Sequence, residues 1–136
     1  MNAVKTFIDT NVLIYAFTAD EPEKQKTAIN FIDGCLPVIS TQVIKEFSNV
    51  LIRKTNMDSR HIRELINEIT NAADVVNERI ELIFTSLDIH KRYKFPFCDS
   101  LIIAAAQSSK CQVLLSEDMQ DGQIIDGKLK IINPFA

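Results

Sequence analysis

The sequence predicts an α/β fold in which a parallel sheet is covered by helices on both faces. Short strand-like runs alternate with longer helical patterns along the chain, which is the order of βαβ units. The 136 residues are 46% hydrophobic and 24% charged, which is typical of one globular domain spanning residues 1–136. Because ligands of such sheets bind beyond the C-terminal ends of the strands, acidic residues at those ends are the first candidates for a site.

Two strand-like runs and two helices are expected in the first part of the chain. Residues 4–8 form a strand-like run, and an apolar segment follows at 12–17. The Glu-Pro-Glu stretch at 21–23 predicts a helix start, because proline fits the first turn and acids favour a helix N-terminus. Gly34 is well placed to end this helix.

The second run, at residues 37–40, is followed by Thr41, which can N-cap the next helix. Apolar residues of that helix recur at i, i+4, i+7 and i+8: Val43, Phe47, Val50 and Leu51.

Three further helices are expected in the second part. Asp58 or Ser59 can cap an amphipathic helix over 58–74, whose apolar residues recur at i, i+3, i+4 and i+7 from Ile62, and residues 78–94 repeat this spacing from Ile80. Residues 99–108 are apolar nearly all round, which predicts a buried helix. Three short runs complete a sheet of five strands: 74–77, 112–115 and 129–132.

Glycine and cysteine usage excludes several classes of site. The three glycines cannot form a dinucleotide-binding GxGxxG motif or a P-loop, so any phosphate handling needs another device, such as a metal ion. The three cysteines are odd in number, widely spaced and never in CxxC, which excludes a disulfide framework or a zinc site. We expect all three to be reduced packing residues: Cys35, Cys98 and Cys111.

The net charge of −3 argues against a protein that binds nucleic acid by bulk charge alone. The first residues show no signal-peptide pattern. The longest apolar runs, 12–17 and 101–106, are far shorter than the ~20 residues that a membrane span needs. We therefore expect a cytoplasmic protein without a membrane segment.

Four carboxylates stand out by position. Asp9 and Asp118 each follow a strand-like run, Glu46 borders an apolar helix stripe, and Asp99 opens the small-residue helix. Each has an ordinary alternative: an N-cap for Asp9 and Asp99, a snorkelling side chain for Glu46, and a solvated turn for Asp118. Four carboxylates at one sheet edge would repel one another unless a divalent cation such as Mg²⁺ or Mn²⁺ lay among them.

Four segments resemble, in order and in spacing, the motifs of the PIN-domain nucleases. They are FIDTNVLIY at residues 7–15, VIKEF at 43–47, FCDSLIIAAA at 97–106 and LLSEDMQDG at 114–122, with a tail INPF at 132–135. The resemblance runs essentially from end to end. It implies an α/β/α sandwich with a parallel five-stranded sheet, and a Mg²⁺- or Mn²⁺-dependent endoribonuclease that leaves a 5′-phosphate and a 3′-hydroxyl.

The small size makes the chain most similar to the VapC-type toxins of toxin–antitoxin pairs. That resemblance implies an RNA substrate such as tRNA or rRNA, a cognate antitoxin and a homodimer. It also implies an acidic site of Asp9, Glu46, Asp99 and Asp118, with Asp9, Asp99 and Asp118 holding the metal. Thr10, Asn11 and Ser116 occupy the supporting positions, and Asp121 is a further acid that also fits an ordinary turn with Gly122.

Basic residues near the acids would hold the RNA. Arg53 is the best single candidate, because it lies seven positions after Glu46 and thus roughly two turns along the same helix edge. Four further cations are secondary candidates, and an ordinary solvated helix face is the alternative for each: Lys45, Lys54, Arg60 and Arg63. His61 and His90 fall inside helical patterns, away from strand ends, and are expected to be surface or structural residues.

Two alternatives remain from the residues. A strand followed by Asp also opens haloacid-dehalogenase-type phosphatases, but those usually carry a second Asp where this chain has Asn11, and no suitably placed catalytic Lys is evident. A non-catalytic or non-toxin RNA-binding protein on the same fold is the other alternative, although loss of an acid would mark a non-catalytic form and all four are present.

Overall fold

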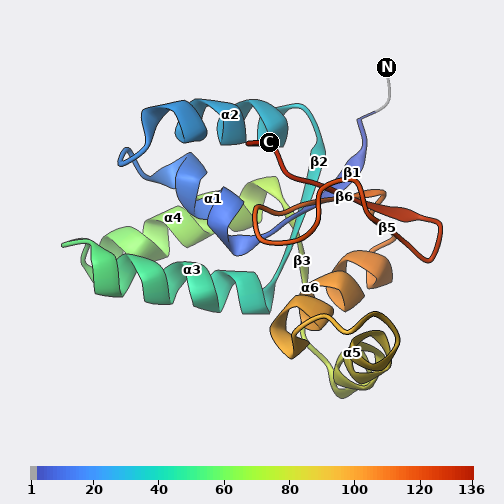
Figure 1. Ribbon diagram of the computed structural model, residues 1–136. Helices are drawn as coiled ribbons and strands as arrows, with labels where there is room; N and C mark the ends of the chain where they lie inside the picture. Colours follow the sequence, from blue (N-terminus) through green and yellow to red (C-terminus); the bar gives the residue numbers. More distant parts are fainter. Residues whose placement is uncertain (1–2) are drawn as a thin grey trace.

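The computed structural model describes residues 3–136 as a sheet with helices on either side (Figure 1). The elements follow one another in the order β1 (Lys5–Ile8), α1 (Thr10–Phe17), α2 (Pro22–Asp33), β2 (Leu36–Ser40), α3 (Thr41–Lys54), α4 (Ser59–Ala72), β3 (Asp74–Val76), α5 (Ile80–Tyr93), α6 (Phe97–Ser108), β4 (Val113–Leu115), β5 (Ile124–Ile125) and β6 (Leu129–Ile132). The apolar segment at 12–17 thus forms most of helix α1.

The sheet has six strands in the order β3-β2-β1-β4-β6-β5. The five expected strands are all present and pair in parallel, which confirms the α/β class. The expected count of five is one too low, because β5 pairs antiparallel with β6 at the edge. A two-residue strand carries no alternating pattern, and the turn after it depends on positive φ at Asp126 (52°) and Gly127 (69°).

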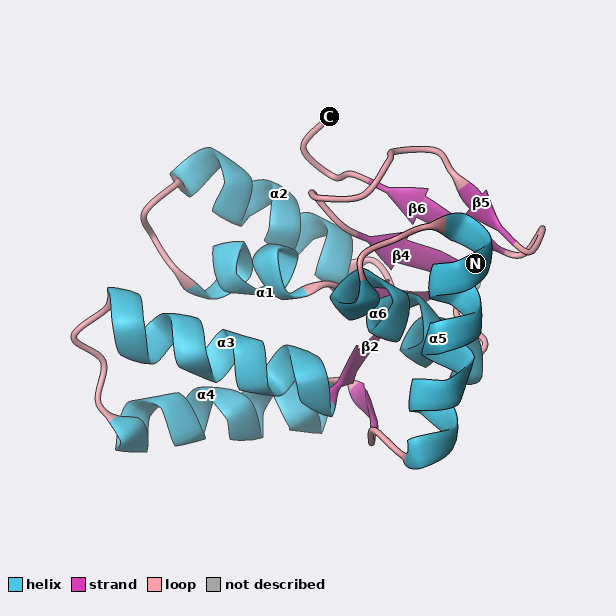
Figure 2. Ribbon diagram, turned by 60° about the horizontal axis from the view of Figure 1, so that its bottom comes forward, coloured by secondary structure: helices cyan, strands magenta, loops and turns pink. Residues whose placement is uncertain are grey.

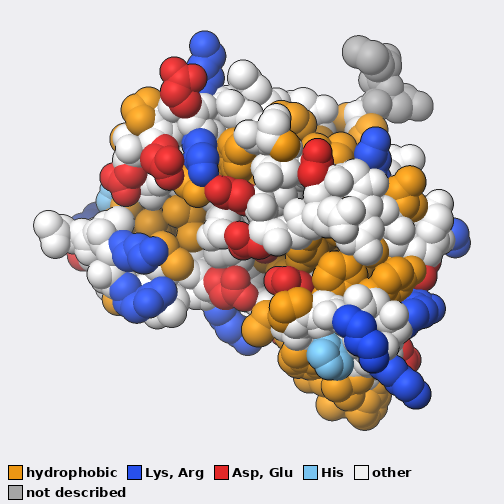
Figure 3. All heavy atoms as spheres, in the orientation of Figure 1, with side chains coloured by type: hydrophobic (Ala, Val, Ile, Leu, Met, Phe, Trp, Pro, Cys, Tyr) orange, Lys and Arg blue, Asp and Glu red, His pale blue; other side chains and the backbone are white. Residues whose placement is uncertain are grey.

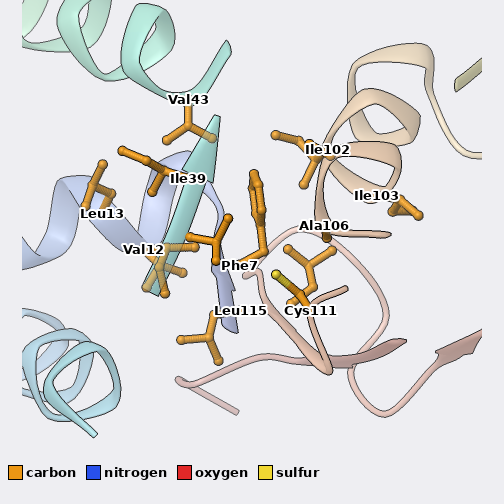
Figure 4. Packing of buried hydrophobic residues seen from close by; sticks show 14 of the residues in the cluster. Phe7, Val12, Leu13, Ile39, Val43, Ile102, Ile103, Ala106, Cys111 and Leu115 are labelled. Carbon is orange, nitrogen blue, oxygen red and sulfur yellow. The ribbon is translucent and has the colours of Figure 1, made fainter. Parts of the chain in front are cut away.

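Helices α1 to α4 lie on one side of the sheet, and α5 and α6 lie on the other (Figures 1 and 2). The strands in the middle are therefore buried on both faces. Figure 4 shows Phe7 of β1 between Val12 of α1 on one side and Ile102 and Ala106 of α6 on the other. The apolar character of α6 follows from this position, and residues 102–106 are all buried.

The helix starts agree with the sequence to within a few residues. Asp58 caps α4 as expected, since its carboxylate accepts a hydrogen bond from the His61 N–H. The cap of α3 is Ser40 rather than Thr41, with the Ser40 hydroxyl accepting from the Val43 N–H. Helix α6 begins at Phe97 after Pro96, so Asp99 lies within the first turn and is not the cap.

The three cysteines are free thiols. Cys111 is buried and Cys35 half-buried, as expected of packing residues, but Cys98 is exposed, so that expectation is wrong for it. Its place at the second position of α6, next to a hollow in the surface, explains the exposure. Within residues 3–136, no helix is long and apolar enough to cross a membrane.

Candidate active site

The ends of β1 and β4 bring Asp9 and the loop after β4 together. These strands are neighbours in the sheet, with Ile8 paired to Leu115, and the Asp9 N–H donates to the Leu115 carbonyl at 3.0 Å. Parallel strands end at the same edge of a sheet, so the segments that follow them share one site. The N-terminal part of α3 adds Glu46 from the same edge, and the first turn of α6 adds Asp99.

Asp9 is buried and held by two donors. One carboxylate oxygen accepts from the Thr10 N–H at 2.7 Å and the other from the Ser116 hydroxyl at 2.9 Å. Asp9 is also the N-cap of α1. Asp9 can therefore be both the N-cap of α1 and a residue of the site, because capping uses one carboxylate oxygen and fixes the direction of the other.

Glu46 has donors on both carboxylate oxygens. The Thr10 hydroxyl donates to Oε2 at 2.8 Å, and the side-chain amide of Gln42 donates to Oε1 at 2.9 Å. The same amide donates to the backbone carbonyl of Cys98 at 3.2 Å. Glu46 is therefore oriented into the site, not a solvated side chain.

Asp118 and Asp99 complete the group of acids. The Asn11 side-chain amide donates to Asp118 at 2.9 Å, and the Asp118 N–H donates weakly to the Ser116 hydroxyl at 3.3 Å. Each of the three expected supporting residues thus donates from its side chain to one acid: Thr10 to Glu46, Asn11 to Asp118, and Ser116 to Asp9. Asp99 is half-buried and accepts no hydrogen bond from the rest of the described chain.

The four acids line one small pocket of about 80 Å³. The other lining residues are Thr10, Asn11, Gln42, Cys98 and Ile102, so no Lys or Arg from residues 3–136 lines it. Figure 3 shows acidic side chains gathered near the centre of one face, where α1, α3 and α6 meet. Larger hollows on the surface are lined by few acids, so charge rather than size marks this site.

Crowding and burial shift the pKa values of two acids upward. Burial raises the pKa of Asp9 to about 6, with smaller contributions from the charges of Asp99 and Glu46, although the two hydrogen bonds oppose the shift. Burial also raises the pKa of Asp99, helped by the charges of Asp118 and Glu46. Upward shifts of neighbouring carboxyl groups mean that a bound cation would lower the energy of the site.

The donor set fits a hydrated Mg²⁺ or Mn²⁺ ion, because both prefer oxygen ligands and Mg²⁺ keeps several of its waters. Among the described residues, no three Asp, Glu, His or Cys side chains are already grouped closely enough to form a ligand shell by themselves. Contacts through water thus suit the site better than a closed protein cage.

Other residues singled out from the sequence lie outside the pocket. The Asp121 carboxylate accepts from the Asn133 N–H at 2.8 Å, which supports its turn interpretation. Arg53 is exposed and does not line the pocket. His61 and His90 are both exposed, on α4 and α5.

A hollow of about 230 Å³ adjoins the acid pocket through Asn11, which lines both. Lys54 of α3 lines this hollow, and Arg53 does not. The sequence had ranked Lys54 only as a secondary candidate, below Arg53. Gln42 is the residue of the site that the sequence did not indicate, since no local pattern connects it to Cys98.

The fold and the acidic edge define the class of the protein. The PIN domain family matches residues 6–120, so the chain belongs to the PIN-domain family. This membership excludes the haloacid-dehalogenase-type phosphatase. No curated protein sequence matches significantly.

Solved structures of toxin–antitoxin proteins share the fold at low identity. A toxin–antitoxin complex from Klebsiella pneumoniae has a TM-score of 0.71 at 19% identity, covering 95% of this chain and 97% of that one. VapC20 of Mycobacterium tuberculosis, a sarcin–ricin loop cleaving toxin, has a TM-score of 0.68 at 16% identity, covering 83% and 91%. VapBC2 of Rickettsia felis, bound to a promoter DNA fragment, has a TM-score of 0.67 at 12% identity, covering 95% and 99%.

Proposed function

We propose that the chain is a Mg²⁺- or Mn²⁺-dependent endoribonuclease and the toxin of a toxin–antitoxin pair. The observation that carries the proposal is the convergence of Asp9, Glu46, Asp99 and Asp118 on one pocket without a basic residue from the described chain. PIN-family membership supports a nuclease, and a non-catalytic protein would have no need to keep four mutually repelling acids together.

In this proposal Asp9, Asp99 and Asp118 hold the metal, directly or through its waters. A bound divalent ion would supply a more acidic water and neutralise charge on the phosphodiester. Ser116 and the Thr10 N–H keep the Asp9 carboxylate in one orientation, and Asn11 does the same for Asp118. Glu46 either completes the ligand set or orients the attacking water.

The proposed substrate is RNA, and the resemblance to VapC-type toxins suggests tRNA or rRNA. Lys54 is better placed than Arg53 to contact a phosphate beside the acids, because it lines the hollow next to the acid pocket. The proposed protein partner is an antitoxin, and the proposed location is the cytoplasm. These assignments are supported by the toxin–antitoxin proteins that share the fold, one of which, VapC20, is a sarcin–ricin loop cleaving toxin.

Removal of the metal tests the proposal. We expect the purified protein to cleave at least one RNA of a panel of tRNAs and rRNA fragments in Mg²⁺ or Mn²⁺, because the acids need a cation to act on a phosphodiester. Addition of EDTA should abolish cleavage, and an excess of Mn²⁺ should restore it. Denaturing gels of end-labelled RNA give the measurement, and cleavage that persists in EDTA would contradict the proposed chemistry.

We also propose a homodimer that is formed through α5. Four apolar side chains are exposed along one stripe of this helix: Ile80 (56%), Ile83 (36%), Phe84 (59%) and Leu87 (48%). Figure 3 shows hydrophobic side chains gathered over α5. Pairing of two copies about a two-fold axis would bury this stripe against the same stripe of the other subunit.

Disruption of the stripe should therefore separate the subunits. We expect Phe84→Asp to raise the dimer dissociation constant by about 100-fold, because it places a charge at the centre of an apolar contact. Light scattering after size exclusion would measure the mass across a concentration series. Phe31→Asp is the matched control, since Phe31 is 40% exposed on α2, outside the stripe. A monomer at all concentrations, or equal loss in both variants, would be inconsistent with this interface.

A further inference from the structure

Gln42 joins two sides of the acid pocket through one side-chain amide. It lies in the first turn of α3 and is 8% exposed. Its Nε2 donates to Glu46 Oε1 at 2.9 Å and to the Cys98 carbonyl at 3.2 Å. Cys98 directly precedes Asp99 in the first turn of α6. One neutral group therefore links the helix that carries Glu46 to the turn that carries Asp99.

The amide fixes the orientation of the Glu46 carboxylate. Thr10 donates to the second oxygen at 2.8 Å, so the carboxylate is held from both sides. A glutamate with several free torsions would otherwise sample many orientations and lose side-chain entropy when it acted. Because an amide has no net charge, it orients Glu46 without neutralising the negative potential that attracts a cation. A Lys or Arg at this position would do both.

The link between helices also fixes the spacing of two acids that come from distant parts of the chain. Gln42 and Cys98 are 56 positions apart in the sequence. Partners that orient a metal ligand without touching the metal often change metal affinity by about 10- to 100-fold when they are removed. The hydrogen bonds of Gln42 have the arrangement of such a partner.

We propose that Gln42 is a positioning residue, which acts through Glu46 and the first turn of α6 to set the geometry of the acid pocket. This inference rests on the proposed function only in that the pocket is assigned to a divalent cation. Gln42 lies outside the segments that resemble the PIN motifs, so the assignment comes from its contacts alone.

Mn²⁺ binding to the RNA-free protein tests the positioning role. Gln42→Met keeps a similar volume and removes both donors, so we expect Mn²⁺ binding about tenfold weaker by calorimetry. In a Glu46→Ala background the same substitution should weaken binding by clearly less than in the natural chain, because only the link to the Cys98 carbonyl is then left to lose. Gln107→Met is the matched control, since the Gln107 amide donates to Asp126 at 2.8 Å, away from the pocket.

A Gln42→Met protein that binds Mn²⁺ as tightly as the natural chain would overturn the inference, and so would an equal loss in the Glu46→Ala background. The side-chain NH₂ signals of Gln42 in an ¹⁵N-correlated NMR spectrum give a readout without metal. We expect Glu46→Ala to move them, and unmoved signals would also overturn the inference. If the natural chain bound no Mn²⁺, the proposed function would fail, and the NMR result alone would decide whether Gln42 positions Glu46.

Discussion

Replacing Asp9 with Asn is expected to lower the rate of RNA cleavage by about a thousandfold or more while the fold is retained. Asp9 contributes the most buried of the four carboxylates, and its second oxygen is directed by Ser116. Asparagine has nearly the same shape and can still accept from the Thr10 N–H, but it removes the negative charge that would hold a metal ion. The change therefore affects the proposed chemistry far more than the packing.

Cleavage of a labelled RNA would be followed with equal amounts of natural and substituted protein. Asp121→Asn is the matched control, because Asp121 lies near the same loop but binds the Asn133 N–H outside the pocket, and its activity should stay within about twofold. In cells, strong expression of the natural chain should arrest growth, and the Asp9→Asn chain should not. Equal cleavage by both proteins would disprove the proposed role of Asp9, whereas unimpaired growth with the active chain would count against the toxin role alone.

The sequence predicted the larger part of the fold because most of it follows from local patterns. Alternating strand-like runs and apolar helix faces located five parallel strands, and the nearly all-apolar character of 99–108 predicted a helix buried against the sheet. Strand β5 was missed because its two residues, Ile124 and Ile125, are held by pairing with β6 rather than by any pattern of their own. The cap of α3 moved by one residue because both Ser40 and Thr41 carry suitable hydroxyls.

The candidate site was predictable where it depends on strand ends and motifs, and not where it depends on contacts across the fold. Asp9 and Asp118 follow neighbouring strands, so sheet topology alone brings them together. The place of Gln42 depends on a hydrogen bond to Cys98, which no spacing rule can anticipate. Whether Arg53 or Lys54 faces the acids depends on the rotation of α3 about its axis, because neighbouring residues of a helix point about 100° apart.

Without metal, the stabilising contribution of Asp9 should decrease as the pH rises from about 4 to 6. Folding raises the pKa of Asp9 from 3.8 to about 6, mainly through burial. Between these values the unfolded chain has released its proton while the folded protein keeps it, so each increase in pH favours unfolding. Above about pH 6 both states are ionised and the penalty is constant. The shift corresponds to roughly 3 kcal/mol of unfolding free energy over the whole interval.

The difference between the natural chain and Asp9→Asn isolates this effect. The pKa of Asp99 shifts in the same direction. The hydrogen bond from Lys24 lowers the pKa of Glu117, and chiefly the hydrogen bond from Tyr93 lowers that of Asp126. The total pH dependence therefore combines several groups. The free energy of unfolding would be measured in urea and EDTA at pH 4, 5, 6 and 7. Relative to the natural chain, that of Asp9→Asn should rise with pH by up to about 3 kcal/mol. At pH 7 without EDTA, Mn²⁺ at 100 times its dissociation constant should raise the free energy of unfolding of the natural chain by about 2.7 kcal/mol and that of Asp9→Asn by little. A difference that stays flat from pH 4 to 7 would mean that Asp9 is not a buried, charge-penalised carboxylate.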